Sequence, residues 1–133
     1  MSAYYLYSKL LRSGVSRHIG TEGIDIAAGA REVRVPVMLL QTVVENAIKH
    51  GIAELPGGGV LRISAMLGES ALNVEVRNPR PATSTPREQQ GSGLHNAAER
   101  LRLLFGSRAD LELDLSQSDL AIVRIQVPKE VAA

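Results

Sequence analysis

Among the polar residues between Pro36 and Gly51, four carry side chains that could together bind a metal–phosphate group. Placed at the helical step, they share one arc of roughly 140°, and apolar residues share the other side. A solvated face would explain such an arc on a generic helix. This arc mixes a carboxylate, a carboxamide, an ammonium and an imidazole, whereas ordinary surfaces favour repeated Glu/Lys pairs. The mixture favours a binding site made by Glu45, Asn46, Lys49 and His50, with Thr42 on the same arc.

The stretch that presents these residues has the sequence of one helix. Pro36 suits the first helical position, where its missing N–H costs nothing. Gly51 suits the residue just past the end, where a left-handed conformation is favoured. Lys49 and His50 place positive charge at the negative end of the helix dipole. We expect the opposite face to be buried through Val37, Leu40, Val43, Val44, Ala47 and Ile48.

A second candidate site lies at Gly91-Ser92-Gly93, just before a helix predicted over Leu94–Phe105 and ended by Gly106. The predicted buried face of this helix is Leu94, Ala97, Ala98, Leu101, Leu104 and Phe105. Glycines let backbone N–H groups converge, and a helix N-terminus adds partial positive charge. Alone, this junction is more simply the end of a loop. Together with the polar helix face, it predicts a nucleotide triphosphate held between two helices under a flexible lid. The lid would be Asn78–Gly93, which has three prolines and no large apolar side chain.

The remaining segments predict an α+β domain in two layers, a mixed sheet of about five strands with about three helices on one face. An N-terminal helix would carry three tyrosines, Tyr4, Tyr5 and Tyr7, which either pack on the core or form a docking face. The glycine-rich Leu55–Gly59 lacks a following Lys-Ser/Thr and is predicted to be a turn. The other predicted elements are a helix at Ala3–Arg12, a weak strand at Arg17–Ile26, and hairpins at Val60–Leu67 with Ala71–Arg77 and at Ala109–Leu115 with Leu120–Val127.

Composition narrows the function classes. The 133 residues suffice for one domain, residues 1–133, with its own core. The net charge of +1 gives no electrostatic case for nucleic acid or for membrane contact. There is no cysteine, the three histidines lack metal-ligand spacing, and no apolar run approaches the ~20 residues of a membrane span. We therefore expect a cytoplasmic domain, whether whole or cut from a longer chain.

Three segments carry a family resemblance that covers nearly the whole chain. They are PVMLLQTVVENAIKHG, VEVRNP and GSGLHNAAERLRLLFG. They resemble the N box, the G1 position and the G2 box of the ATP-binding domain of sensor histidine kinases, in the wider gyrase, Hsp90, histidine kinase and MutL group. More narrowly, they are similar to the LytS/AlgZ-type kinases, which work with LytTR-type response regulators. The resemblance implies the Bergerat ATP-binding fold, a two-layer α/β sandwich.

The resemblance also implies ATP and Mg²⁺ as cofactors and a role for each matching residue. Asn46 would ligate Mg²⁺ through its carboxamide oxygen. Glu45 would take the acid/base position beside the γ-phosphate, and Lys49 and His50 would contact phosphate oxygens. Asn96 and Arg100 would either contact the ligand or hold the lid or the helix end. The end of the lid would cradle phosphate through Gly91, Ser92, Gly93 and Leu94.

The sequence departs from the wider family pattern at the G1 position. Most members carry Asp-x-Gly-x-Gly there, whereas this chain has Asn78-Pro79-Arg80-Pro81. The Asn78 oxygen could accept from an adenine N–H and its amide could donate to a ring nitrogen. Prolines in place of glycines make the loop backbone stiffer.

The resulting hypothesis is the catalytic domain of a two-component sensor histidine kinase. It would donate the γ-phosphoryl of ATP to a histidine on a separate dimerisation domain, and the whole sensor would be membrane-anchored. The first alternative is a degenerate nucleotide-binding or docking module that signals without phosphoryl transfer. The second is an anti-sigma-factor serine kinase or small ATPase on the same fold.

Overall fold

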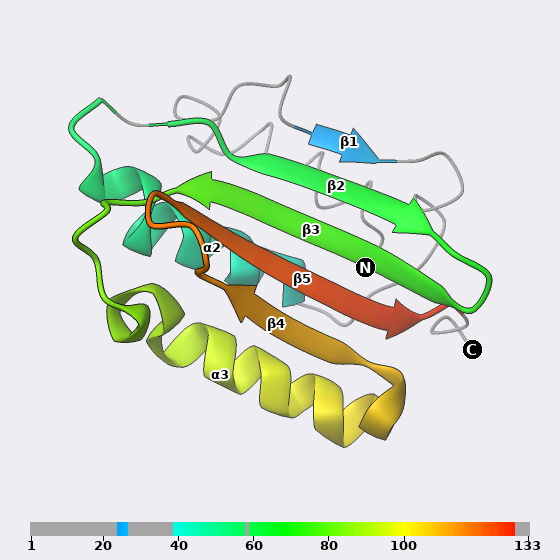
Figure 1. Cartoon of the computed structure of the whole chain (residues 1–133). Helices are drawn as coiled ribbons and strands as arrows, with labels where there is room; N and C mark the ends of the chain where they lie inside the picture. The colour runs from blue at the N-terminus through cyan, green and yellow to red at the C-terminus, as the bar shows by residue number, and fades with distance from the viewer. Residues whose placement is uncertain (1–23, 27–38, 58, 130–133) are drawn as a thin grey trace.

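The computed structural model describes residues 24–26, 39–57 and 59–129. Within them, five strands form one sheet in the order β1-β2-β3-β5-β4, and helices α2 and α3 lie on one side of it (Figure 1). β1 pairs with β2 in parallel and the other neighbours are antiparallel. The predicted two-layer α+β architecture with a mixed sheet is confirmed. The predicted helix at Ala3–Arg12, with its tyrosines, lies outside the described residues.

Both predicted hairpins are present. β2 and β3 join through the turn at Gly68–Ser70, and β4 and β5 pair across residues 115–119. The predicted weak strand is described only at its end, as β1. The elements are β1 (Ile24–Ile26), α2 (Leu39–His50), the 3-10 helix η4 (Ile52–Glu54), β2 (Arg62–Leu67), β3 (Ala71–Pro79), α3 (Pro86–Phe105), the 3-10 helix η5 (Gly106–Arg108), β4 (Asp110–Asp114) and β5 (Leu120–Pro128).

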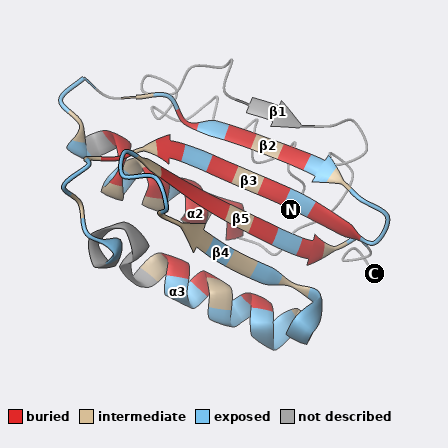
Figure 2. Cartoon of the chain, viewed as in Figure 1, coloured by how far each residue is buried: buried red, intermediate tan, exposed pale blue. Residues whose placement is uncertain are grey.

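The core lies between the helices and one face of the sheet (Figure 2). Alternate residues of β2, β3 and β5 point into it, and each large aliphatic side chain buried there contributes about 1.5–3 kcal/mol. The predicted apolar faces are largely confirmed, except that Val37 lies outside the described residues. Leu104 is an exception at 56% exposed, because Phe105 rather than Leu104 continues the buried stripe of α3. The helices contribute Leu39, Leu40, Val43, Val44, Ala47, Leu94, Ala97 and Leu101.

α3 begins at Pro86, eight residues before the predicted start at Leu94. Asn78 and Pro79 belong to β3, so the connection between strand and helix is only residues 80–85. The predicted long loop over Asn78–Gly93 is therefore wrong. Thr85-Pro86-Arg87-Glu88 has the sequence of a helix start, with proline at the first helical position and Thr-x-x-Glu as a capping box. The helix continues through the glycines, at about 1 kcal/mol each relative to alanine. Its end at Gly106, with φ of 59°, is as predicted.

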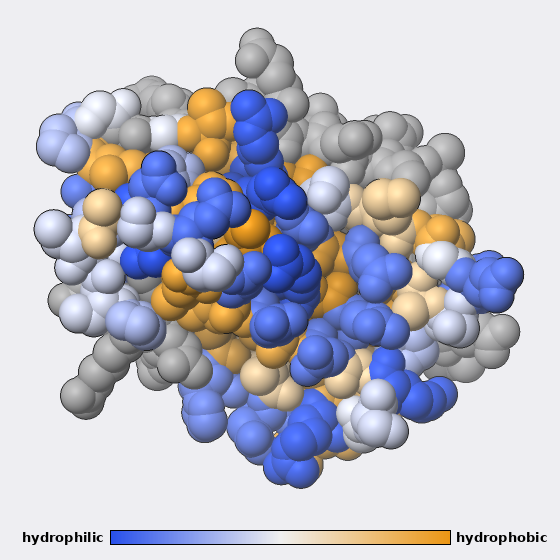
Figure 3. Space-filling model, in the orientation of Figure 1, coloured by the Kyte–Doolittle hydropathy of each residue, from blue (hydrophilic) through white to orange (hydrophobic). Residues whose placement is uncertain are grey.

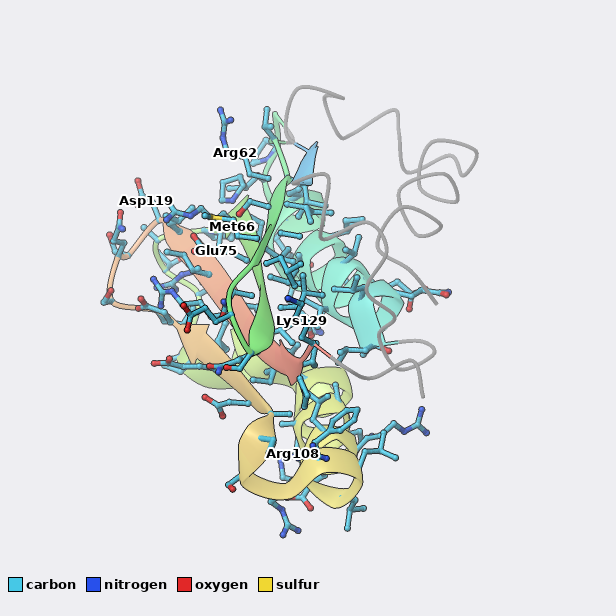
Figure 4. All side chains as sticks on the ribbon, turned by 90° about the vertical axis from the view of Figure 1, so that its right-hand side faces the viewer. Arg62, Met66, Glu75, Arg108, Asp119 and Lys129 are labelled. Atoms are coloured by element: carbon cyan, nitrogen blue, oxygen red, sulfur yellow. The ribbon has the colours of Figure 1, made fainter. Side chains whose placement is uncertain are left out.

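The sheet face turned away from the helices carries many hydrophilic side chains, with apolar surface visible between them (Figure 3). Glu75 lies on this side, opposite α2 (Figure 4). Arg124 joins two strands, since its Nη1 lies 2.8 Å from Asp114 Oδ2 and its Nε 3.9 Å from Glu75 Oε2. The backbone N–H of Ser116 donates to Asp114 Oδ1 at 2.9 Å. The pKa of Asp114 therefore lies well below its usual range. The largest cause is the hydrogen bond from the Ser116 N–H, and the second is the hydrogen bond from Arg124.

Asp114→Asn should lower the melting temperature at pH 7 but not at strongly acid pH. Because the folded-state pKa is depressed, the carboxylate stabilises the fold above its unfolded pKa of about 3.9, and this contribution is lost as the pH falls below that value. Thermal melts of wild type and variant from pH 7 to pH 2 should therefore converge at low pH. Asp110→Asn is the control, since it removes an exposed carboxylate from the same strand. A difference that stays constant with pH would contradict this account.

Candidate functional site

A cleft of about 320 Å³ lies between α2 and α3. Its volume is at the lower end of the ~300–1,000 Å³ typical of small-molecule sites. Apolar and polar groups from both helices line it, so it could hold a flat apolar group and hydrogen-bond a polar one. The lining residues are Leu39, Thr42, Gly93, Asn96, Ala97, Arg100 and Leu101.

α2 and α3 approach each other closely at this cleft. A Cβ added to Gly93 would lie 3.3 Å from Thr42 Cγ2, so the backbone of α3 passes close to the polar side of α2. The predicted anion site at a helix start is wrong for this conformation, because Gly91–Gly93 lie inside α3 rather than at its beginning. Backbone N–H groups within a helix are bonded to carbonyls four residues earlier and do not converge on an anion.

The polar residues predicted on α2 lie along its C-terminal half, beyond the cleft lining. Glu45 and Lys49 are exposed, whereas Asn46 and His50 are half-buried. The Glu45 carboxylate accepts a hydrogen bond from Gln41 Nε2 at 3.0 Å. Glu45, Asn46, Lys49 and His50 together form what we call the α2 row. Thr42 lies one turn before Asn46 and lines the cleft, so it lies between the α2 row and the cleft. Its position on the predicted polar arc was the available signal, although it was not among the predicted ligand-binding residues.

Asn78 lies where the end of β3 meets the end of α2. Its side chain is 2% exposed, and its Nδ2 donates to the Pro79 carbonyl at 3.1 Å. A Cβ added to Gly51 would lie 2.1 Å from Asn78 Nδ2 and 2.8 Å from Pro79 O. The φ of Gly51 is −121°, so the predicted left-handed conformation is wrong. Glycine is required there because the strand passes too close for a side chain.

Arg80 is the residue that sequence reasoning missed. It lies in a loop flanked by prolines, a context typical of exposed arginine, yet it is 6% exposed. Its guanidinium donates to carbonyls of the β4–β5 connection, to the first carbonyl of β5 and to Ser84. No local pattern encodes these partners, because three of them lie 35 to 40 residues further along the chain.

A magnesium ion would find few protein ligands here. Over the described ranges, no cluster of three or more His, Cys, Asp or Glu side chains could hold a metal. The donors near the α2 row are instead carboxamides, a hydroxyl and a single carboxylate. This set fits Mg²⁺, which commonly uses one or two protein oxygens and completes its shell with phosphates and water.

No protein-family model matches the chain. The sensor histidine kinase BtsS of Escherichia coli K12 is 27% identical over 105 residues, and that of Shigella flexneri matches equally. The match covers 79% of this chain, which spans 19% of the length of these curated relatives.

Solved histidine kinase structures share the fold. The kinase domain of the E. coli osmosensor EnvZ has a TM-score of 0.67 at 15% identity, covering 100% of this chain and 89% of that one. The catalytic domain of ThkA, in a nucleotide-free form, has a TM-score of 0.64 at 16% identity, with coverage of 97% and 94%. AdeS of Acinetobacter baumannii gives 0.65 at 14%, with coverage of 98% and 66%.

The chain has the fold of histidine kinase catalytic domains. The predicted fold class is thereby confirmed, since these domains share its α+β architecture. In that frame, the α2 row, the end of β3 and α3 are the three segments predicted to form the ATP site. The individual roles of Glu45, Asn46 and the other predicted site residues stay predictions. No helix in the described part is long and apolar enough to cross a membrane.

Gly51→Ala should destabilise the protein by about 1–3 kcal/mol through overpacking. The new methyl would clash with Asn78 and with two carbonyl oxygens, those of Ala47 and Pro79. Gly57→Ala is the matched control, because a Cβ there meets nothing within 4 Å. Urea unfolding of both variants measures the effect. Equal stabilities would show that the end of β3 does not press against α2.

Proposed function

We propose that this chain binds Mg-ATP and acts as the catalytic domain of a sensor histidine kinase. The observation that carries the proposal is the cleft between α2 and α3, where Gly93 approaches Thr42 and the polar row of α2 begins. The histidine kinase fold and the similarity to BtsS support the same reading. The γ-phosphoryl would pass to a histidine on a separate dimerisation domain.

The chain would hold the nucleotide at three places. Asn46 would supply a carboxamide oxygen to Mg²⁺, and Lys49 and His50 would contact phosphate oxygens from the last turn of α2. Asn78 would recognise the adenine edge at the end of β3. Asn96 and Arg100 would contact the ligand from α3, since both line the cleft.

The phosphate contacts proposed for Gly91, Ser92, Gly93 and Leu94 require a change in α3. Their N–H groups become available only if the first turns of this helix open. Gly91 and Gly93 make opening easier, since each weakens the helix by about 1 kcal/mol relative to alanine. The same segment would then form the lid over the phosphates.

Catalysis would depend on positioning and charge neutralisation. Bound Mg²⁺ would neutralise charge on the phosphoryl group that is transferred. Lys49 is exposed at the end of α2 and would add a positive charge on the same side. Glu45 would accept or relay a proton at its carboxylate, which here accepts from Gln41.

We assign the chain to the LytS/AlgZ type on the three motifs quoted above, with a LytTR-type response regulator as the downstream partner. The domain would work in the cytoplasm, attached to a membrane-anchored sensor. A transfer assay with purified dimerisation-domain protein, against serine substrates, would distinguish this assignment from a serine kinase of the same fold.

Mg-ATP at a hundred times its dissociation constant should stabilise the fold by about 2.7 kcal/mol and raise the melting temperature on the order of 10 °C. Asn46→Asp should remove most of that shift by changing the charge and coordination at the metal. Asn73→Asp makes the same chemical change at an exposed position of β3 and serves as the control. Differential scanning fluorimetry measures the melting-temperature shift with Mg-ATP for the wild type, Asn46→Asp and Asn73→Asp. An unchanged shift in Asn46→Asp would refute the metal role of this residue.

The competing candidate is a docking module that has lost nucleotide binding. Two observations favour it: Asn78 is buried against the end of α2, and α3 is helical through the glycines of the expected lid. It requires that millimolar Mg-ATP leave the melting temperature unchanged while a dimerisation-domain protein binds tightly by calorimetry.

A further inference from the structure

Arg80 is a buried cation held by neutral oxygen atoms. Its five N–H donors match the five hydrogen bonds of its guanidinium. Nε donates to the Leu120 carbonyl, Nη1 to the Ser84 carbonyl and hydroxyl, and Nη2 to the carbonyls of Leu115 and Gln117. None of the ion pairs formed among the described residues includes Arg80. Burying a charge in this way is costly unless every donor is satisfied.

These bonds join three segments at one point. Arg80 follows directly on β3, and Ser84 belongs to the connection that leads into α3. The other acceptors lie in residues 115–119, which link β4 to β5, and at Leu120, where β5 begins. Backbone bonds reinforce the junction, since Arg80 N donates to the Asp119 carbonyl at 3.0 Å and Ser84 N to the Pro81 carbonyl at 2.9 Å. The Ser84 hydroxyl also donates to Pro81 O at 2.6 Å. The Arg80 side chain therefore holds in place both the end of β3 and the connection that leads into α3.

The junction lies two residues from Asn78. The Asn78 amide is oriented by the Pro79 carbonyl, and Pro79 is the neighbour of Arg80. With all five donors used, Arg80 has no N–H free for phosphate in this conformation. We propose that Arg80 is a positioning residue for base discrimination, which holds the Pro79 carbonyl and hence the Asn78 amide in place. This inference rests on the proposed nucleotide function.

The test compares nucleotide affinities in Arg80→Met and Arg80→Lys, measured by calorimetry well below each melting temperature. We expect Arg80→Met to weaken ATP roughly tenfold, the equivalent of one lost hydrogen bond to the base, while inorganic tripolyphosphate binds as before. Arg80→Lys should recover only part of the loss, because an ammonium cannot reproduce the five-donor fork. Arg77→Met removes an exposed arginine of β3 that pairs with Glu75, and this control variant should behave as wild type.

An equal loss for ATP and tripolyphosphate, or full recovery by lysine, would overturn the positioning role. Hydrogen exchange without nucleotide provides a second readout, in which the amides of Arg80, Ser84 and Leu120 should lose protection together in the Arg80 variants. Unchanged protection would refute the junction itself. If the wild type binds no nucleotide, the proposed function and the base role both fail, while exchange still decides whether Arg80 joins the segments. If Arg80→Met fails to fold, nucleotide affinity and hydrogen exchange are both measured on Arg80→Lys instead.

Discussion

The close approach of the end of β3 to the end of α2 is the constraint on which the rest of this structure depends. Gly51 has room for no side chain there, since an added Cβ would lie 2.1 Å from Asn78 Nδ2. The contact brings the last turn of α2, with Lys49 and His50, to the same end of the sheet as Asn78. Arg80, which directly follows β3, ties the end of this strand to the β4–β5 connection by donating to its carbonyls.

α3 forms the side of the cleft that lies opposite α2. Its buried residues fasten it to the core, while its exposed side faces solvent and its N-terminal part approaches Thr42 of α2 through Gly93. Because no side chain stands between the helices at Gly93, a cleft forms beside this contact. The same glycines that permit the approach also weaken the helix, so packing and ligand access depend on the same residues.

Hydrophobic periodicity was enough to predict the sheet, both hairpins and the buried faces of α2 and α3, because burial of alternating or helically spaced residues determines them. Periodicity could not predict the start of α3, because residues 86–93 carry no large apolar side chain, and the only local signal there is the helix start at Thr85-Pro86. The left-handed Gly51 was wrong because its requirement comes from a strand distant in sequence. Arg80 could not be predicted at all, since its acceptors are backbone carbonyls that only the tertiary fold brings together.

Amide chemical-shift mapping with Mg²⁺ and a non-hydrolysable ATP analogue tests the central claim most directly, that the nucleotide binds where α2, α3 and the end of β3 converge. The largest changes should fall on Thr42, Asn46, Asn78, Gly93 and Asn96. The outer sheet face around Glu75, Asp114 and Arg124 should be unaffected. Absence of any change at saturating analogue, or changes centred on the outer face, would contradict the account.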